Sequence, residues 1–157
     1  MARKIRIGNA MLADYVALGN RNKHNLVNVF SGDVLVDAFP SDLSFGVYIE
    51  LKGDRPEDIP EAFDLEVVYA EQTILKGKGR GVVGKGMTSV AFVVPLFQFE
   101  ALREGDLEMK LSAAGFQETT AIKKHISLNP APTASPNASP PPSEQSRPAA
   151  RRIKRFV

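Results

Sequence analysis

The sequence contains no cysteine and no tryptophan, and its 157 residues include only two histidines. Without cysteine the chain has no disulfide, no thiolate metal ligand and no cysteine nucleophile. Because small secreted domains often depend on disulfides, this absence favours the cytoplasm. No apolar run reaches the roughly 18 residues that a membrane helix needs, and the basic start lacks the apolar stretch of a signal peptide. We therefore expect a soluble, cytoplasmic protein without a transmembrane segment.

Patterns of catalytic and metal-binding residues are also missing. His24 and His125 have no ligand pattern around them, and no nucleophile elbow is present. Of two groups of carboxylates, the first lies at strand ends and turns, where Asp bonds to the backbone, and the second lacks the glycine-bearing spacing of a calcium loop. These groups are Asp14, Asp33, Asp37 and Asp42, and Asp54, Glu57, Asp58 and Glu61. We predict no catalytic residue, no metal and no cofactor, and a protein that is not an enzyme.

A β-hairpin is the clearest element that the sequence does contain, and it spans Gly105–Leu128. Polar residues in its first half alternate with Leu107, Met109 and Leu111. This period of two places the apolar side chains on one face of a strand. Gly115 can adopt a positive φ and so permits a tight turn. Lys124 falls in the apolar phase of the return strand, so we expect a bulge near Lys123 and Lys124 or a sheet-edge position.

Further short stretches alternate apolar and polar residues or are rich in β-branched residues, with turn signals between them. They are residues 4–7, 9–18, 26–31, 34–39, 45–51, 63–69, 72–76 and 87–99. Residues 9–18 fit a helix about as well as a strand, and we prefer a strand because strands follow. Residues 40–44 are expected to be a loop, and Asp54 or Pro56 can open one helical turn. Residues 87–99 are expected to be a central strand, with Pro95 at its end or at an edge position. The pattern predicts an all-β antiparallel sandwich of about seven to nine strands.

The composition changes abruptly after Leu128. Residues 129–146 hold six prolines with many Ala and Ser and no large apolar residue, which predicts a disordered tail with polyproline II character. Residues 1–128 carry 15 Lys and Arg against 17 Asp and Glu, a net charge of −2, whereas residues 129–157 carry five against one, a net charge of +4. The tail ends in a basic cluster of Arg151, Arg152, Lys154 and Arg155. We predict a folded domain at 1–128 and a tail at 129–157.

The glycine-rich segment 76–86 is the second basic feature. Its last part, Gly79–Gly86, nearly spells the phosphate-binding pattern Gly-x4-Gly-Lys-Ser/Thr. The final hydroxyl is replaced by Gly86, and an apolar β-branched stretch follows where a P-loop requires a helix. We therefore interpret the segment as a flexible hairpin loop. Non-specific contact with an anion is the alternative, because no acidic residue separates its cations, which are Lys76, Lys78, Arg80 and Lys85.

Several short motifs resemble the opening of a family of small bacterial proteins that is classed as a domain of unknown function. They are Met11-Leu-Ala-Asp-Tyr-Val16, Leu26-Val-Asn-Val-Phe-Ser-Gly32, Phe39-Pro40 and Phe45-Gly-Val-Tyr-Ile-Glu-Leu51. The closing hairpin at 105–128 completes a likeness that covers about residues 1–128 and excludes the tail. The resemblance implies an immunoglobulin-like β-sandwich. It implies no activity, cofactor or catalytic residue, and segment 76–86 is not typical of the family.

Two functions from different classes follow. The first is a non-enzymatic β-sandwich that acts as an interaction or structural module and binds a protein partner. The alternative is binding to nucleic acid or another anionic surface through the basic loop and the basic tail. The contacts in that case would be Lys76, Lys78, Arg80, Lys85, Arg151, Arg152, Lys154 and Arg155. A pocket for a carbohydrate or another small ligand is a third reading, which the shortage of aromatic residues disfavours.

Overall fold

The computed structural model of the chain describes residues 5–20, 23–80 and 86–130. This part consists of nine strands and one short 3₁₀ turn, η1 (Pro56–Asp58). The strands are β1 (Ile5–Leu18), β2 (His24–Val29), β3 (Val34–Val36), β4 (Ser41–Gly53), β5 (Ala62–Tyr69), β6 (Gln72–Arg80), β7 (Ser89–Ala101), β8 (Gly105–Ala113) and β9 (Phe116–Leu128). The all-β prediction is therefore confirmed. No helix of the described residues is long and apolar enough to cross a membrane.

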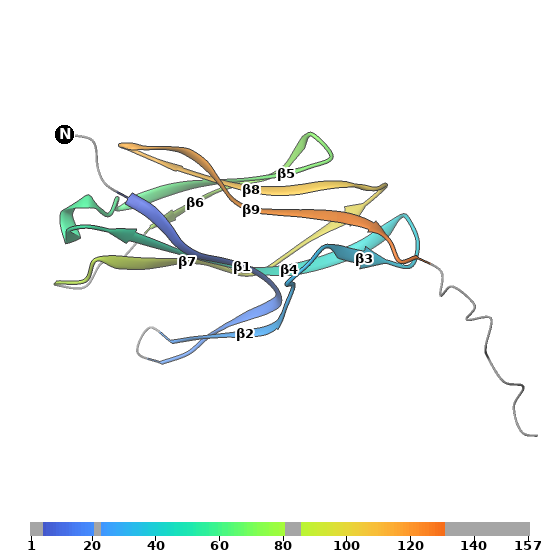
Figure 1. Ribbon diagram of the computed structural model, residues 1–157, viewed down its shortest axis with the longest axis horizontal. Coiled ribbons are helices and arrows are strands. Elements are labelled where there is room, and N and C mark those ends of the chain that lie inside the picture. The colour runs from blue at the N-terminus through green and yellow to red at the C-terminus, as the bar shows by residue number, and fades with distance from the viewer. Residues whose placement is uncertain (1–4, 21–22, 81–85, 131–157) are drawn as a thin grey trace, which may run out of the picture.

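The strands form two curled sheets that lie one above the other (Figure 1). Sheet A has the order β2-β1-β4-β7, and sheet B has the order β3-β9-β8-β5-β6. All but one of the strand pairs are antiparallel. The exception corrects the expectation of a purely antiparallel sandwich, because β3 runs parallel to the end of β9, with Val34 beside Ile126 and Val36 beside Leu128.

The hydrophobic core lies between the sheets and follows the period of two that the sequence shows. In β4 the buried residues are Phe45, Val47, Ile49 and Leu51, and in β8 they are Leu107, Met109 and Leu111. Burial of each such side chain contributes about 1.5–3 kcal/mol relative to exposure. The predicted closing hairpin is confirmed as β8 and β9, and its turn contains Gly115 with a φ of 79°.

Other boundaries differ from the expectations. The bulge in β9 lies opposite Met109 and Lys110, near residues 120–122 rather than at Lys123 and Lys124. β4 already begins at Ser41, within the expected loop, and β3 ends at Val36 instead of continuing to residue 39. The stretch at 87–99 forms β7, which is an edge strand rather than a central one. Pro95 was expected at an edge, and it lies in β7 opposite the register shift of β4.

The expected piece at 4–7 and the ambiguous piece at 9–18 form one long strand, β1. Its first part pairs with β4, and residues 13–18 pair with residues 24–29 of β2. These two segments, which we call the ribbon, extend away from the two packed sheets and run below them in the view of Figure 1. The crossing is possible because Gly46 has no side chain: a Cβ there would lie 2.6 Å from the Val16 nitrogen and 2.8 Å from the Pro95 carbonyl oxygen. The ribbon thus partly covers the outer face of the other two strands of sheet A, β4 and β7.

Candidate functional site

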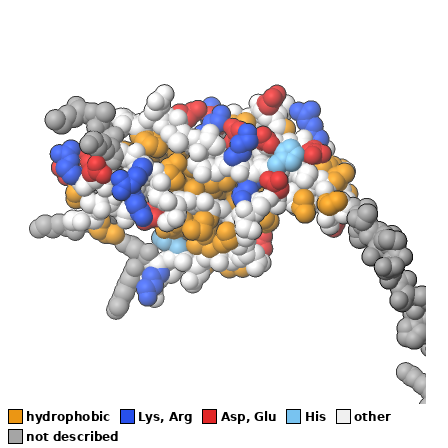
Figure 2. Space-filling view, viewed as in Figure 1, with side chains coloured by type: hydrophobic (Ala, Val, Ile, Leu, Met, Phe, Trp, Pro, Cys, Tyr) orange, Lys and Arg blue, Asp and Glu red, His pale blue; other side chains and the backbone are white. Residues whose placement is uncertain are grey.

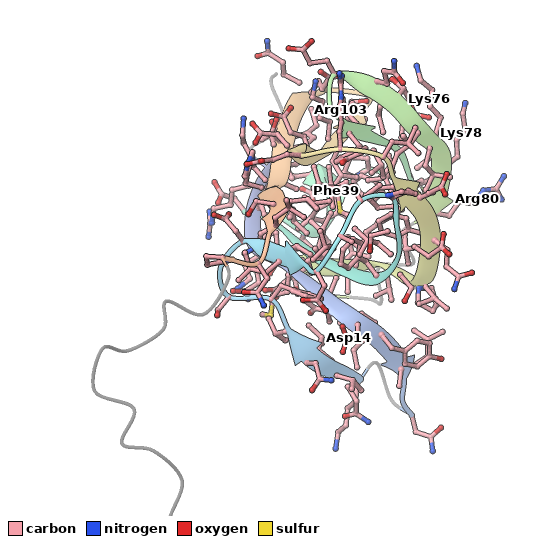
Figure 3. All side chains as sticks on the ribbon, turned by 90° about the vertical axis from the view of Figure 1, so that its right-hand side faces the viewer. Asp14, Phe39, Lys76, Lys78, Arg80 and Arg103 are labelled. Carbon is pink, nitrogen blue, oxygen red and sulfur yellow. The ribbon has the colours of Figure 1, made fainter. Side chains whose placement is uncertain are left out.

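Three of the four basic residues of segment 76–86 lie on a strand rather than in a flexible loop. Lys76, Lys78 and Arg80 alternate along β6 and point outward at one edge of the molecule (Figure 3). Their neighbour β5 supplies the acidic residues that the segment itself lacks. The Lys76 Nζ lies 3.3 Å from a Glu66 carboxylate oxygen, and the Lys78 Nζ lies 3.7 Å from one of Asp64. Two of the predicted anion-binding lysines therefore have carboxylate partners, and these lower the local positive charge.

Arg80 differs from both lysines. Its guanidinium has no ion pair or hydrogen bond among the described residues, although it is exposed and lies at the same edge. The remaining predicted cations, Lys85, Arg151, Arg152, Lys154 and Arg155, lie outside the described residues, as do the tail at 131–157 and its predicted disorder.

The near match to a P-loop has the wrong surroundings for nucleotide binding. Gly79 and Arg80 belong to β6, and Gly86 has a φ of 79°. The next element is strand β7, which begins at Ser89, where a P-loop would place a helix N-terminus. A Cβ on Gly79 would overlap the ring of Phe92, so this glycine makes room for an aromatic side chain and not for a phosphate.

The two carboxylate groups do not form a metal site within the described residues, where no set of three or more ligand-type side chains converges. Instead they bond to their surroundings. Asp14 accepts a hydrogen bond from the Asn28 side-chain amide at 2.7 Å, and Asp33 accepts one from the His125 backbone amide at 3.2 Å. Asp58 is buried and pairs with the Arg55 guanidinium at 3.1 Å across η1, the helical turn that was expected to open at Asp54 or Pro56.

His125 lies in a charged network on the outer face of sheet B. Its Nδ1 is 2.6 Å from an Asp106 oxygen, and its Nε2 is 3.0 Å from a Glu104 oxygen. Figure 2 shows acidic side chains on both sides of a histidine on this face. Hydrogen bonds that the carboxylates of Asp106 and Glu104 accept from the ring raise the pKa of His125, and the bonds donated by His125 and Lys123 lower the pKa of Asp106. The sequence does not reveal this charged network, because strand pairing brings the two carboxylates to His125.

Exposed apolar side chains are concentrated on the ribbon. Tyr15 is 43% exposed, Val27 45%, Val29 46% and Leu18 67%. Cross-strand pairing places Tyr15 beside Val27 on one face, which is turned away from sheet A. The opposite face carries Val16, which is fully buried against sheet A, and His24, whose ring packs on Tyr48 with centroids 5.4 Å apart. The ribbon is therefore apolar on its solvent side as well as on its packed side.

Of the four edge strands that the described residues form, β2 alone has none of three features that protect the other edges against pairing with another chain. β3 is only three residues long, β6 carries Lys76 and Lys78, and β7 contains Pro95. Short length, charge and proline are the usual devices that keep edges from pairing. β2 contains no Lys, Arg, Asp, Glu or Pro. The sequence predicts β2 as a strand but does not reveal that it is an edge, because sheet order is set by distant pairings.

A hollow with a volume of about 390 Å³ lies where the ribbon tip meets the outer face of sheet A. Its lining includes His24 of the ribbon, Tyr48 and Glu50 of β4, Arg80 of β6 and Ser89 of β7. Burial, followed by the nearby charge of Glu50, raises the pKa of Tyr48, so its hydroxyl stays protonated at neutral pH. The hollow brings together residues that sequence reasoning treats separately.

Comparison with known proteins adds no relative to this description: no protein-family model and no curated protein matches the chain. The fold and the surfaces described above are therefore the basis for assigning a function.

Proposed function

We propose that the chain is a non-enzymatic interaction module that binds an extended segment of a partner protein along the free edge of β2. The observation that carries this proposal is the β2 edge, which has no charged residue or proline, beside the exposed apolar face of the ribbon. A strand that adds to such an edge gains main-chain hydrogen bonds, and its alternate side chains can lie against the neighbouring apolar face. Tyr15, Val27 and Val29 form that face.

The chemistry of the ribbon favours one occupant. Lys23 is exposed at its end, whereas Asp14 is held by Asn28, so a partner segment with an acidic residue near that end is complementary. The basic tail of the chain itself is repelled by the same end. The few half-exposed side chains offer on the order of 300 Å², well below the roughly 800 Å² per subunit of a stable dimer. An extended peptide therefore fits better than a second copy.

A displayed library of random extended peptides tests the proposal with the full chain as bait. We expect enrichment of segments that alternate β-branched or aromatic residues with polar ones and contain an acidic residue. Binding should be lost in Val27→Lys and retained in Leu35→Lys, a matched change at an exposed apolar residue of edge strand β3. Enrichment that Val27→Lys leaves unchanged would contradict the proposal. Recovery of peptides that match the tail would identify the tail as the occupant, and dimers that form with rising concentration would identify a second copy.

A second function is supported by the segregation of charge. Residues 129–157 carry the net charge of +4, while the preceding 128 residues carry −2. Because Lys76 and Lys78 have carboxylate partners, attraction to nucleic acid or another anionic surface would come mainly from the tail cluster. The test of this alternative is given with the whole-molecule prediction in the Discussion.

The finer description of the fold and its setting also belongs to the proposal. We infer that the sandwich is immunoglobulin-like and related to the domain of unknown function that its opening motifs resemble. The two facing sheets support the first part of this inference. The absence of cysteine supports a cytoplasmic location.

A further inference from the structure

The hollow between the ribbon and the outer face of sheet A is lined by residues that are far apart in the chain. His24 reaches over the outer face of sheet A and packs on Tyr48, with an angle of 58° between the two rings. Ser89 and Glu50 lie on neighbouring strands of that face, and Arg80 comes from the other sheet. At about 390 Å³ the hollow is within the range of small-ligand pockets, which begins near 300 Å³.

Its electrostatics favour an anion. One Glu50 oxygen accepts a hydrogen bond from the Asn9 amide at 2.7 Å and lies 3.3 Å from the Lys52 Nζ, so these partners offset part of the charge of this carboxylate. The guanidinium of Arg80, in contrast, has no ion pair with any residue that the structure describes. An arginine can hold a carboxylate or a phosphate with two parallel hydrogen bonds. The protonated hydroxyl of Tyr48 and the hydroxyl of Ser89 are further donors.

We propose that this hollow binds a small organic oxyanion, with the carboxylate or phosphate held by Arg80 at the rim and a flat ring lying against Tyr48 and His24. The ring pair supplies an apolar contact surface, and Met87 adds a flexible apolar side chain to the lining. The hollow beside Lys76 and Lys78, of about 430 Å³, is a poorer candidate because its cations already have partners. The proposal is independent of the peptide proposal, since the solvent face of the ribbon is not involved.

Titration of the full chain with three probes tests the site, with amide chemical shifts and calorimetry as the measurements. Benzoate and phenyl phosphate carry the oxyanion and the ring and distinguish the two possible oxyanions, whereas benzamide is a neutral control. We expect at least one of the two anions to shift the amide signals of Tyr48, Ser89 and Ala91, and benzamide to leave them unchanged. Loss of the charge in Arg80→Gln should weaken binding at least about tenfold.

Two variants separate this site from general attraction to the basic edge. Lys78→Gln removes a cation two residues earlier on the same strand, and it should leave the affinity within about twofold because exposed ion pairs contribute little. His24→Ala removes one ring and should weaken binding while the rest of the spectrum stays folded. The proposal would be overturned by equal losses in Arg80→Gln and Lys78→Gln, by equal binding of benzamide, or by no shift with any probe.

Discussion

At the residue scale, the pairing register of β8 and β9 determines which charged groups surround His125. β8 and β9 pair so that Asp106 lies directly beside His125, and the turn before β8 brings Glu104 to the other ring nitrogen. The sequence places these acidic residues about twenty positions away, so neither proximity nor spacing predicts the cluster. Local alternation predicts which face His125 occupies, but only the bulges in β9 determine which carboxylates it meets.

His125 leads to a prediction about pH. Its pKa in the folded protein lies above the ordinary value of 6.5, because Asp106 and Glu104 accept hydrogen bonds from the protonated ring. A histidine whose pKa is higher in the folded than in the unfolded state contributes to the stability of the fold. This contribution is complete below the unfolded-state pKa and disappears as the pH rises through the folded-state pKa. We expect His125→Gln to lower the free energy of unfolding at pH 5.5–6.5 and to differ less from the unchanged protein at alkaline pH.

Urea denaturation of the unchanged protein and of His125→Gln, from pH 5.5 to alkaline pH, measures this difference in stability. NMR titration of the ring protons measures the pKa of His125. The pKa of Asp106 lies below its usual value, so its side of the pair remains ionised throughout the range. A stability difference that is constant with pH would show that the ring contributes packing alone.

At the scale of elements, the sequence predicts strands better than it predicts their neighbours. The alternation in Phe63–Tyr69 and in the first half of Gly105–Leu128 is regular, and both regions form the expected strands. β6 extends to Arg80, and Gly79 marks close packing rather than a loop, because Phe92 occupies the space beside it. The parallel pairing of β3 with β9 joins segments at opposite ends of the domain, and no local pattern contains that information.

The ribbon gives a prediction at this scale. Gly46→Ala places a methyl group 2.6 Å from the Val16 nitrogen, where backbone atoms must move to accommodate it. We expect a loss of about 1–3 kcal/mol in the free energy of unfolding, together with displacement of His24 from Tyr48. Urea denaturation measures the loss, and amide chemical shifts of the ribbon measure the displacement.

Gly77→Ala is the matched control, since a Cβ at that strand position meets nothing within 4 Å. Its stability should change by less than about 1 kcal/mol, which is the propensity difference between the two residues in a strand. Equal losses in the two variants would show that the ribbon does not depend on the close approach at Gly46.

At the scale of the whole molecule, charge separates the two parts of the chain and gives the test of the alternative function. Removal of residues 147–157 deletes all five basic residues of the tail. If the tail binds nucleic acid, this deletion should abolish duplex binding, and the logarithm of the full chain's affinity should fall with the logarithm of salt concentration with a slope of about −4. Fluorescence anisotropy with a labelled duplex measures both. Binding that survives the deletion would place the contact on the domain, with Arg80 as the first residue to replace.

The position of β9 has a consequence for synthesis and folding. This strand is an interior member of sheet B, between β8 and β3, although it is the last strand that the described residues form. Until Leu128 has left the ribosome, β3 lacks its only partner strand and β8 presents an open edge to other nascent chains. Sheet B is therefore completed only after translation has passed the whole domain, and premature termination within β9 would produce a chain prone to aggregation.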